Sequence, residues 1–308
     1  GVPMERPVRL SRPAIAVHGG AGSWPRDELE GARAVIRRAV EEGLRASRRG
    51  GAVEMVVEAV SVMEDSGAFD AGVGSVLDYE GRVAMDAGVM RGSDLAVGAV
   101  AAVSYPRNPV RLAREVMLRT PHSLIVGPWA DELARRLGLP PHPGPSERAL
   151  RRWRELRESP ADARVRERVE AARALGYGTV GAVAVDESGE LAAAVSTGGV
   201  VLKLPGRVGD SPIPGAGFYA TRSAAFAATG VGEFILRLGL SLRASVIYEL
   251  TGDVASAVEG AVAALTSAFG EGTGGLIGMD AGGRAWGAYN TAAMPWAAGD
   301  ASGKLVVL

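Results

Sequence analysis

The order of apolar and polar positions divides the chain into short buried runs and longer stretches with helical spacing. Nearly unbroken apolar runs predict strands at 14–18, 82–90, 95–103, 179–185, 191–196, 275–279 and 284–289. Apolar residues recurring three and four positions apart predict helices over 27–49, 52–64, 128–137, 232–250 and 254–269. A further helix is predicted to begin at Pro109, with Asn108 as its cap.

Turn residues join four of these strands into two hairpins. Residues 186–189 separate one pair and residues 280–283 the other, and both turns contain aspartate and glycine. The strands come in clusters with helices between them, rather than in regular strand–helix alternation. This order favours sheets stacked face to face with helices outside over parallel βαβ units.

The segment 138–175 differs in character from the rest of the chain. Its first part contains prolines at 140, 141, 143 and 145, which predict a loop, and residues 147–173 are dense in arginine and glutamate. This mixture of charges is typical of a solvated helix with intrahelical ion pairs.

Composition excludes several classes of function. The 308 residues include 34 basic and 35 acidic side chains, so the net charge of −1 gives no electrostatic footprint for nucleic acid or an anionic membrane. The absence of cysteine excludes disulfides, thiolate catalysis and cysteine-ligated metals. The three histidines, His18, His122 and His142, lack the spacing of a metal site.

The distribution of charge also bears on location. The longest charge-free stretch, 285–299, is too short and too polar to span a bilayer, and residues 1–7 lack the apolar core of a signal peptide. We therefore expect a soluble, cytoplasmic protein. The length is compatible with one large layered domain.

The common catalytic motifs are absent. There is no G-x-S-x-G nucleophile elbow and no phosphate-binding lysine motif. The run His18-Gly-Gly-Ala-Gly22 follows a predicted strand and is typical of a tight turn or of an oxyanion-binding loop. A nucleotide-binding loop is disfavoured, because this run lacks the G-x-G-x-x-G spacing and the acidic residue that would contact the ribose.

A glycine–threonine pair, Gly178-Thr179, opens the strand at 179–185. A threonine hydroxyl is a weak nucleophile unless a base lies beside it, and the α-amine of an N-terminal threonine is one such base. This amine has a pKa of roughly 7.7–8, so it accepts a proton at neutral pH. Thr179 gains this base only if the Gly178–Thr179 bond is cut. Taken alone, Thr179 is more typical of an ordinary β-branched strand residue.

Several motifs in order give the chain a family resemblance. The segments 178–186 (GTVGAVAVD), 196–199 (STGG) and 204–212 (LPGRVGDSP) resemble the start of the small subunit of plant-type (class 2) asparaginases and isoaspartyl peptidases, a family of N-terminal nucleophile hydrolases. The resemblance extends to 17–22, 69–75, 85–92, 229–233, 274–277 and 290–291. It covers nearly the whole chain except 138–175.

The resemblance implies catalytic roles for the matching residues. Thr179 resembles the nucleophile of both self-cleavage and substrate hydrolysis, and Gly178 precedes the cut. Thr197 resembles the threonine that hydrogen-bonds this nucleophile and tunes it. Thr229 and Gly230 resemble an oxyanion hole made of a hydroxyl and a backbone N–H.

The resemblance also implies substrate-binding residues. Arg207 resembles the residue that binds the substrate α-carboxylate, Asp210 resembles the partner of the α-ammonium group, and Gly232 resembles a residue beside them. By spacing alone, Arg207 and Asp210 are also typical of a surface ion pair. One position departs from the family: Asp70 stands where relatives commonly have asparagine, and its carboxylate is expected to alter the amine's pKa or the loop geometry.

No organic cofactor or catalytic metal is implied. The family does have a loop whose backbone carbonyls hold a structural sodium ion, and its matching positions here are Met63, Glu64, Ser66, Phe69, Ala71 and Val73.

The fold implied by the resemblance is an α+β, four-layer αββα sandwich spanning residues 1–308. Self-cleavage would divide it into a large subunit, 1–178, and a small subunit, 179–308, and the cut units would pair as a dimer. The implied reaction is hydrolysis of L-asparagine or of isoaspartyl dipeptides through an acyl-enzyme. Gly178 resembles the asparaginase branch, whereas a glycosylasparaginase-like hydrolase and a small-molecule binder that never matures are the alternatives.

Overall fold

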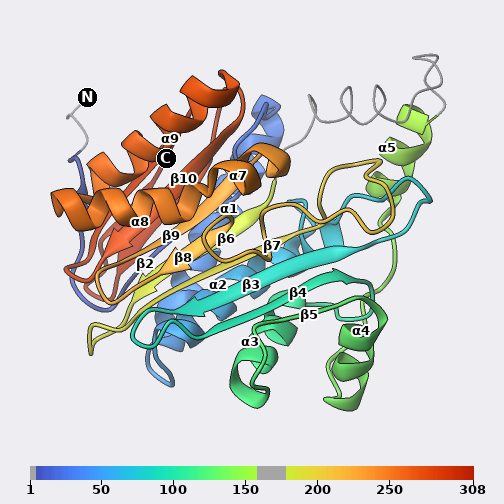
Figure 1. Cartoon of the computed structure of the whole chain (residues 1–308), viewed down its shortest axis with the longest axis horizontal. Helices are drawn as coiled ribbons and strands as arrows, with labels where there is room; N and C mark the ends of the chain where they lie inside the picture. The colour runs from blue at the N-terminus through green and yellow to red at the C-terminus, as the bar shows by residue number, and fades with distance from the viewer. Residues whose placement is uncertain (1–4, 158–177) are drawn as a thin grey trace.

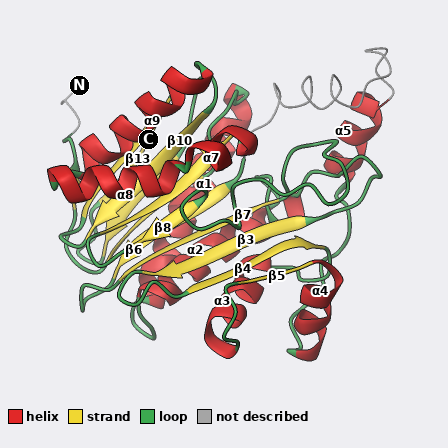
Figure 2. Ribbon diagram, viewed as in Figure 1, coloured by secondary structure: helices red, strands yellow, loops and turns green. Residues whose placement is uncertain are grey.

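The computed structural model describes residues 5–157 and 178–308. Its centre is an eight-stranded sheet in the order β13-β12-β2-β6-β7-β3-β4-β5 (Figures 1 and 2). Its strands are β2 (Ala14–His18), β3 (Met85–Arg91), β4 (Val97–Val103), β5 (Leu124–Val126), β6 (Val180–Val185), β7 (Leu191–Thr197), β12 (Trp296–Asp300) and β13 (Leu305–Val307). All neighbouring strands of this sheet are antiparallel except β4 and β5.

A second, five-stranded sheet stacks on the first. Its order is β1-β11-β10-β9-β8 and every pairing is antiparallel. Its strands are β1 (Val8–Arg9), β8 (Phe218–Ala220), β9 (Ala224–Gly230), β10 (Gly274–Asp280) and β11 (Arg284–Tyr289). The two predicted hairpins are confirmed as β6–β7 and β10–β11.

Helices cover the outer face of each sheet. On the eight-stranded sheet lie α1 (Arg26–Ala46), α2 (Ala52–Ser66) and α3 (Pro109–Arg119), and on the five-stranded sheet lie α7 (Gly232–Leu238), α8 (Leu240–Thr251) and α9 (Val254–Phe269) (Figure 2). The remaining helices are α4 (Gly127–Arg136), α5 (Glu147–Arg157) and the short 3₁₀ turn η1 (Gly72–Gly74).

Side-chain alternation along the central strands fixes the layers. In β2, Ile15 and Val17 pack into the core beneath α1 and α2, whereas Ala14 and Ala16 pack into the core between the sheets. Because a strand has a side-chain period of two, strands buried on both faces read as unbroken apolar runs. Alanine is the commonest residue of the core between the sheets, where it packs beside larger side chains such as Phe218 and Trp296. The predicted αββα sandwich is confirmed.

Two details of the predicted helices are wrong. The helix expected over 232–250 is interrupted at Gly239, whose left-handed φ of 67° ends α7 and begins α8 at a new angle. Asn108 precedes α3 but makes no side-chain cap; its amide donates instead to Glu64 and Asp65, and a Glu64 oxygen accepts from the Val110 N–H. The charged helix predicted over 147–173 is described only as α5, and residues 158–173 lie outside the described residues.

Candidate active site

Thr179 lies at the entrance of β6, beside the end of β7. Its hydroxyl oxygen is 3.1 Å from the Thr197 hydroxyl, and Thr197 Oγ1 also accepts a hydrogen bond of 3.0 Å from the Gly199 N–H. Antiparallel pairing of Val180 with Ser196 brings the two threonines together, because each is the next residue beyond that pair. Thr197 is buried and Thr179 half-buried. A hydroxyl that can be both donor and acceptor is thereby fixed against the candidate nucleophile.

The residue before Thr179 has an unusual backbone. Gly178 has a φ of 111°, which L side chains rarely adopt. It packs directly on Gly20, itself at φ 109°: a Cβ added to Gly20 would lie 2.4 Å from the Gly178 nitrogen. The turn after β2 thus holds the candidate scissile bond by close backbone contact.

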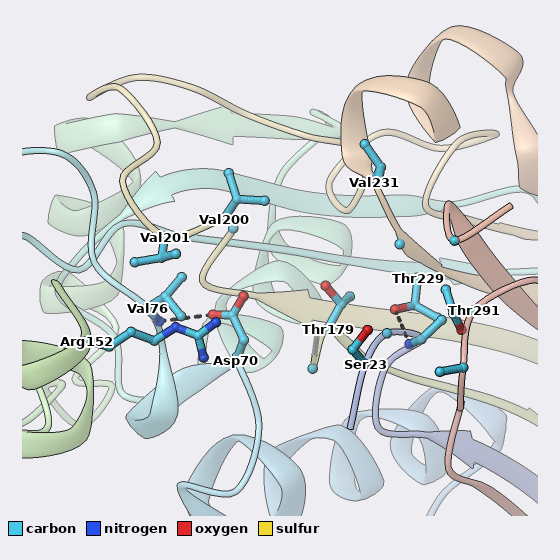
Figure 3. A pocket seen from close by; sticks show the side chains of 17 residues that line it. Ser23, Asp70, Val76, Arg152, Thr179, Val200, Val201, Thr229, Val231 and Thr291 are labelled. Atoms are coloured by element: carbon cyan, nitrogen blue, oxygen red, sulfur yellow. Dashed lines mark hydrogen bonds between the residues drawn. The ribbon is translucent and has the colours of Figure 1, made fainter. Parts of the chain in front are cut away.

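The same turn orients Thr229 at the end of β9. The Ala21 N–H donates a 3.0 Å hydrogen bond to Thr229 Oγ1, and the Thr229 side chain is buried. In Figure 3, Thr229 lies on the opposite side of Thr179 from Asp70. Because the Ala21 contact occupies an acceptor lone pair, the Thr229 hydroxyl proton is directed elsewhere and is available to a substrate oxygen. Gly230, which follows, lines the same cavity as Thr179.

Arg207 and Asp210 face a second cavity that also reaches Thr179. Arg207 is held by two parallel bonds, Nε to Glu233 Oε1 at 2.8 Å and Nη2 to Glu233 Oε2 at 3.0 Å. Asp210 is buried, and its Oδ2 has no hydrogen-bond partner within the described ranges. Burial raises the pKa of Asp210 to about 7, although the Arg207 charge opposes this shift. These residues are therefore not the surface ion pair that their spacing alone allows.

Gly232 explains how the two charged side chains fit. A Cβ at this position would lie 2.7 Å from Arg207 Nη2 and 3.2 Å from Asp210 Oδ1. The glycine is thus the wall against which both charged groups pack.

Asp70 lines the cavity that contains Thr179 (Figure 3). Its Oδ1 accepts a 3.0 Å hydrogen bond from the Val76 N–H, and its backbone carbonyl accepts from the Gly198 N–H. Burial raises the pKa of Asp70 to about 7, and the Val76 N–H and the Lys203 and Arg152 charges oppose the shift. The carboxyl at this position is consequently easier to protonate than an ordinary aspartate.

The six candidate sodium ligands lie together at the end of α2 and in the loop after it. The last carbonyls of a helix lack intrahelical partners, so this end is rich in available oxygens. A Cβ on Gly74 would lie 2.2 Å from the Phe69 carbonyl oxygen, which shows how tightly the loop closes. The Met63 and Ala71 carbonyls each accept one hydrogen bond here, which leaves each a second lone pair.

Three contributors to the site were missed by sequence reasoning. Ala21 acts through its backbone, Glu233 orients Arg207, and Lys203 supports the turn after Thr197: its Nζ donates to the Ala84 carbonyl at 2.5 Å and packs against Gly199. Glu233 and Ala21 stand inside the matched motifs, so their positions were visible, but the sequence carries no signal of what they contact.

His18 is fully buried at the end of β2, and neither ring nitrogen has a hydrogen-bond partner among the described residues. Burial lowers the pKa of His18 to about 3, and the nearby Thr179 backbone offsets this only in part. The unfolded chain therefore binds one more proton than the folded protein between pH 6.5 and about 3, so stability falls as the pH falls through that window.

In the acid range, the free energy of unfolding should fall less steeply with falling pH in His18→Leu than in the wild type. The slopes should differ by one proton, which is about 1.4 kcal/mol per pH unit. Urea unfolding at a series of pH values from 7 to 4 measures this slope. The exposed His122 provides the control, because His122→Leu should leave the slope as in the wild type. An unchanged slope in His18→Leu would contradict the assignment.

The fold and the site together define a class. Two stacked sheets between helical layers, with a glycine–threonine pair at the head of a central strand, are the architecture of N-terminal nucleophile hydrolases.

None of the helices in the described ranges is long and apolar enough to cross a membrane.

Comparison with known proteins narrows the class to a family. The sequence profile described as "Asparaginase" matches residues 11–307. A plant-type L-asparaginase of Pyrobaculum calidifontis is 51% identical over 286 residues, covering 91% of this chain and 94% of its own length. A plant-type L-asparaginase of Pyrococcus horikoshii is 41% identical over 92% of this chain and 95% of its own. An isoaspartyl peptidase/L-asparaginase of Bos taurus is 40% identical over 93% and 92%. The chain belongs to this asparaginase family.

Proposed function

We propose that this protein is an amidohydrolase that uses Thr179 to hydrolyse L-asparagine, isoaspartyl dipeptides or both. The observation that carries the proposal is the 3.1 Å contact between the Thr179 and Thr197 hydroxyls. This contact lies where the cavity lined by Thr229 meets the cavity lined by Arg207 and Asp210. The names of the relatives support the same substrates.

The first step of the proposal is self-cleavage. The Thr179 hydroxyl attacks the Gly178 carbonyl carbon, and the peptide C–N bond breaks as the acyl group moves from nitrogen to oxygen. This shift frees the Thr179 α-amine and leaves an ester on the Thr179 oxygen. Water then hydrolyses the ester, which releases residues up to Gly178 as a carboxylate and restores the Thr179 hydroxyl. The positive φ of Gly178 and its contact with Gly20 support a backbone held for this attack.

The free amine then serves as the base for substrate hydrolysis. It takes the proton of the Thr179 hydroxyl as the oxygen attacks the side-chain carbonyl of the substrate, and it passes that proton to the leaving nitrogen. Thr229 and Gly230 stabilise the oxyanion. A water molecule, activated by the same amine, hydrolyses the acyl-enzyme to release aspartate.

Recognition of the aspartyl part falls to Arg207 and Asp210. The guanidinium of Arg207 is suited to the substrate α-carboxylate, while Glu233 holds the guanidinium in place. The unpartnered, buried oxygen of Asp210 is suited to the α-ammonium group, whose charge would favour ionisation of the carboxyl.

A structural sodium ion is also part of the proposal. The backbone carbonyls of residues 63–73 offer hard oxygen donors at the end of α2, beside the loop that carries Asp70. The ion would fix this loop, and no step of the reaction passes through it. Catalysis itself is proposed to need no cofactor.

We further infer that the cut units pair as dimers in the cytoplasm. Leu242, Val246 and Leu250 recur every fourth residue on α8 and are 44%, 46% and 81% exposed. An exposed apolar stripe of this kind supports association with a second copy.

The proposal is tested by intact mass spectrometry of the purified protein before and after warm incubation, followed by substrate assays. We expect fragments that end at Gly178 and begin at Thr179, and release of aspartate from L-asparagine or from β-aspartyl dipeptides. A single intact mass throughout, with no hydrolysis, would favour a binder that never matures. Release of aspartate from a glycosylated asparagine alone would favour the glycosylasparaginase-like alternative.

A further inference from the structure

Two cavities meet at Thr179, and this inference rests on the function proposed above. Arg207 and Asp210 line one of these cavities. Ser23 and Arg152 line the other, which also contains Thr229. With the aspartyl part of the substrate held by Arg207 and Asp210, its scissile carbonyl lies at the Thr179 hydroxyl. The leaving group must therefore enter the cavity that contains Arg152.

Arg152 gives that cavity a positive wall. Figure 3 shows its side chain pointing into the cavity toward Asp70. The surface continues outward as a hollow lined by Ser23, Pro25, Arg148, Arg151, Arg152, Glu155 and Leu156, in which arginines outnumber the single acidic residue. The positive charge on the leaving-group side of the site therefore attracts negatively charged groups.

The position of Arg152 is set by the packing of α5 on the rest of the fold. Ala149 is only 6% exposed and belongs to the main core, and the Trp153 indole N–H donates to the Tyr79 carbonyl at 3.3 Å. Arg148, one turn before Arg152, forms an ion pair with Glu28 on α1. These anchors lie in α5 itself, so they do not depend on the bond between Gly178 and Thr179.

We propose that Arg152 binds the free α-carboxylate of the leaving amino acid, which makes β-aspartyl dipeptides the preferred substrates of this site. A planar guanidinium with five N–H donors can contact Asp70 and a second carboxylate together. The ammonia released from asparagine carries no carboxylate and gains nothing from Arg152. Amidating the dipeptide removes the charge that Arg152 recognises, and lengthening it by a residue moves that charge away from Arg152.

The test compares three substrates of the matured enzyme: β-aspartyl-alanine, its C-terminal amide, and L-asparagine. In wild type, we expect kcat/KM to be about tenfold higher for the acid than for the amide, which corresponds to about 1.4 kcal/mol. Arg152→Gln should abolish this preference and lower the ratio of kcat/KM for the dipeptide to that for asparagine about tenfold, mainly through KM. Using the ratio cancels any effect that acts on Thr179 through Asp70.

Arg154→Gln is the matched control, because Arg154 is an exposed residue of α5 that lines neither the Thr179 cavity nor the outer hollow; its ratio should remain at the wild-type value. Equal rates for the acid and the amide in wild type would overturn the inference, even if Arg152→Gln failed to mature. So would an Arg152→Gln variant that slows all three substrates by the same factor. A matured wild type that hydrolyses none of the three would instead refute the proposed function.

Discussion

Thr179→Ala should remain one uncut chain and lose on the order of 10⁴-fold or more in hydrolysis, because it lacks both the attacking oxygen and the amine that cleavage frees. Mass spectrometry after prolonged incubation measures the first effect, and aspartate release from L-asparagine or a β-aspartyl dipeptide measures the second. The fold should persist, since Thr179 is half-buried and, within residues 5–157 and 178–308, the hydrogen bond of its hydroxyl is to Thr197.

Thr179→Ser is the matched control for this variant. Serine keeps the hydroxyl and the future α-amine, so this variant should still cut itself and hydrolyse substrate, at a reduced rate. If Thr179→Ala were cut at the same bond as the wild type, Thr179 could not be the nucleophile of maturation.

Gly20→Ala should slow self-cleavage by at least about a hundredfold, because a small displacement of reacting atoms costs that much in rate. The added Cβ would lie 2.4 Å from the Gly178 nitrogen and 2.5 Å from its Cα, and both neighbours are backbone atoms that must shift. The φ of 109° at Gly20 adds strain of its own. The time course of fragment appearance measures the effect.

Gly31→Ala tests whether the loss reflects position rather than the substitution itself. Gly31 lies in α1, where an added Cβ meets nothing within 4 Å, so this variant should mature at the wild-type rate. Circular dichroism melting of both variants separates a local effect from unfolding. Wild-type maturation in Gly20→Ala would show that the turn after β2 does not hold the scissile bond.

The sequence predicted seven strands but missed β9, β12 and the four short strands at the sheet edges, β1, β5, β8 and β13. β2 and β10 lie in unbroken apolar runs, whereas β9 (AAFAATG) and β12 (WAAGD) consist mainly of alanine and glycine, which give no clear strand pattern. β9 and β12 are stabilised by packing on both of their faces against elements distant in sequence, and this tertiary effect is invisible in a local window.

The candidate site shows the same division. Thr179, Thr197 and Arg207 were found through ordered motifs, and the structure places all three around one junction of cavities. The Glu233 clamp on Arg207 and the approach of Arg152 to the cavity depend on how distant elements pack. No spacing rule relates residue 152 to residue 179, so the sequence could not supply the leaving-group side.

The strand order gives the proposed self-cleavage a consequence for how the protein folds. β6 lies between β2 and β7, and β2 in turn lies between β6 and β12, so strands from either side of the Gly178–Thr179 bond interleave within one sheet. Before the cut, folding is a unimolecular reaction. Afterwards each fragment lacks its neighbours, and reassembly requires two molecules to meet, at a rate set by their concentration. The proposed cleavage would thus make assembly effectively one-way: the sheet would form from a continuous chain, and a matured molecule that unfolds in dilute solution would refold only as slowly as its two fragments meet.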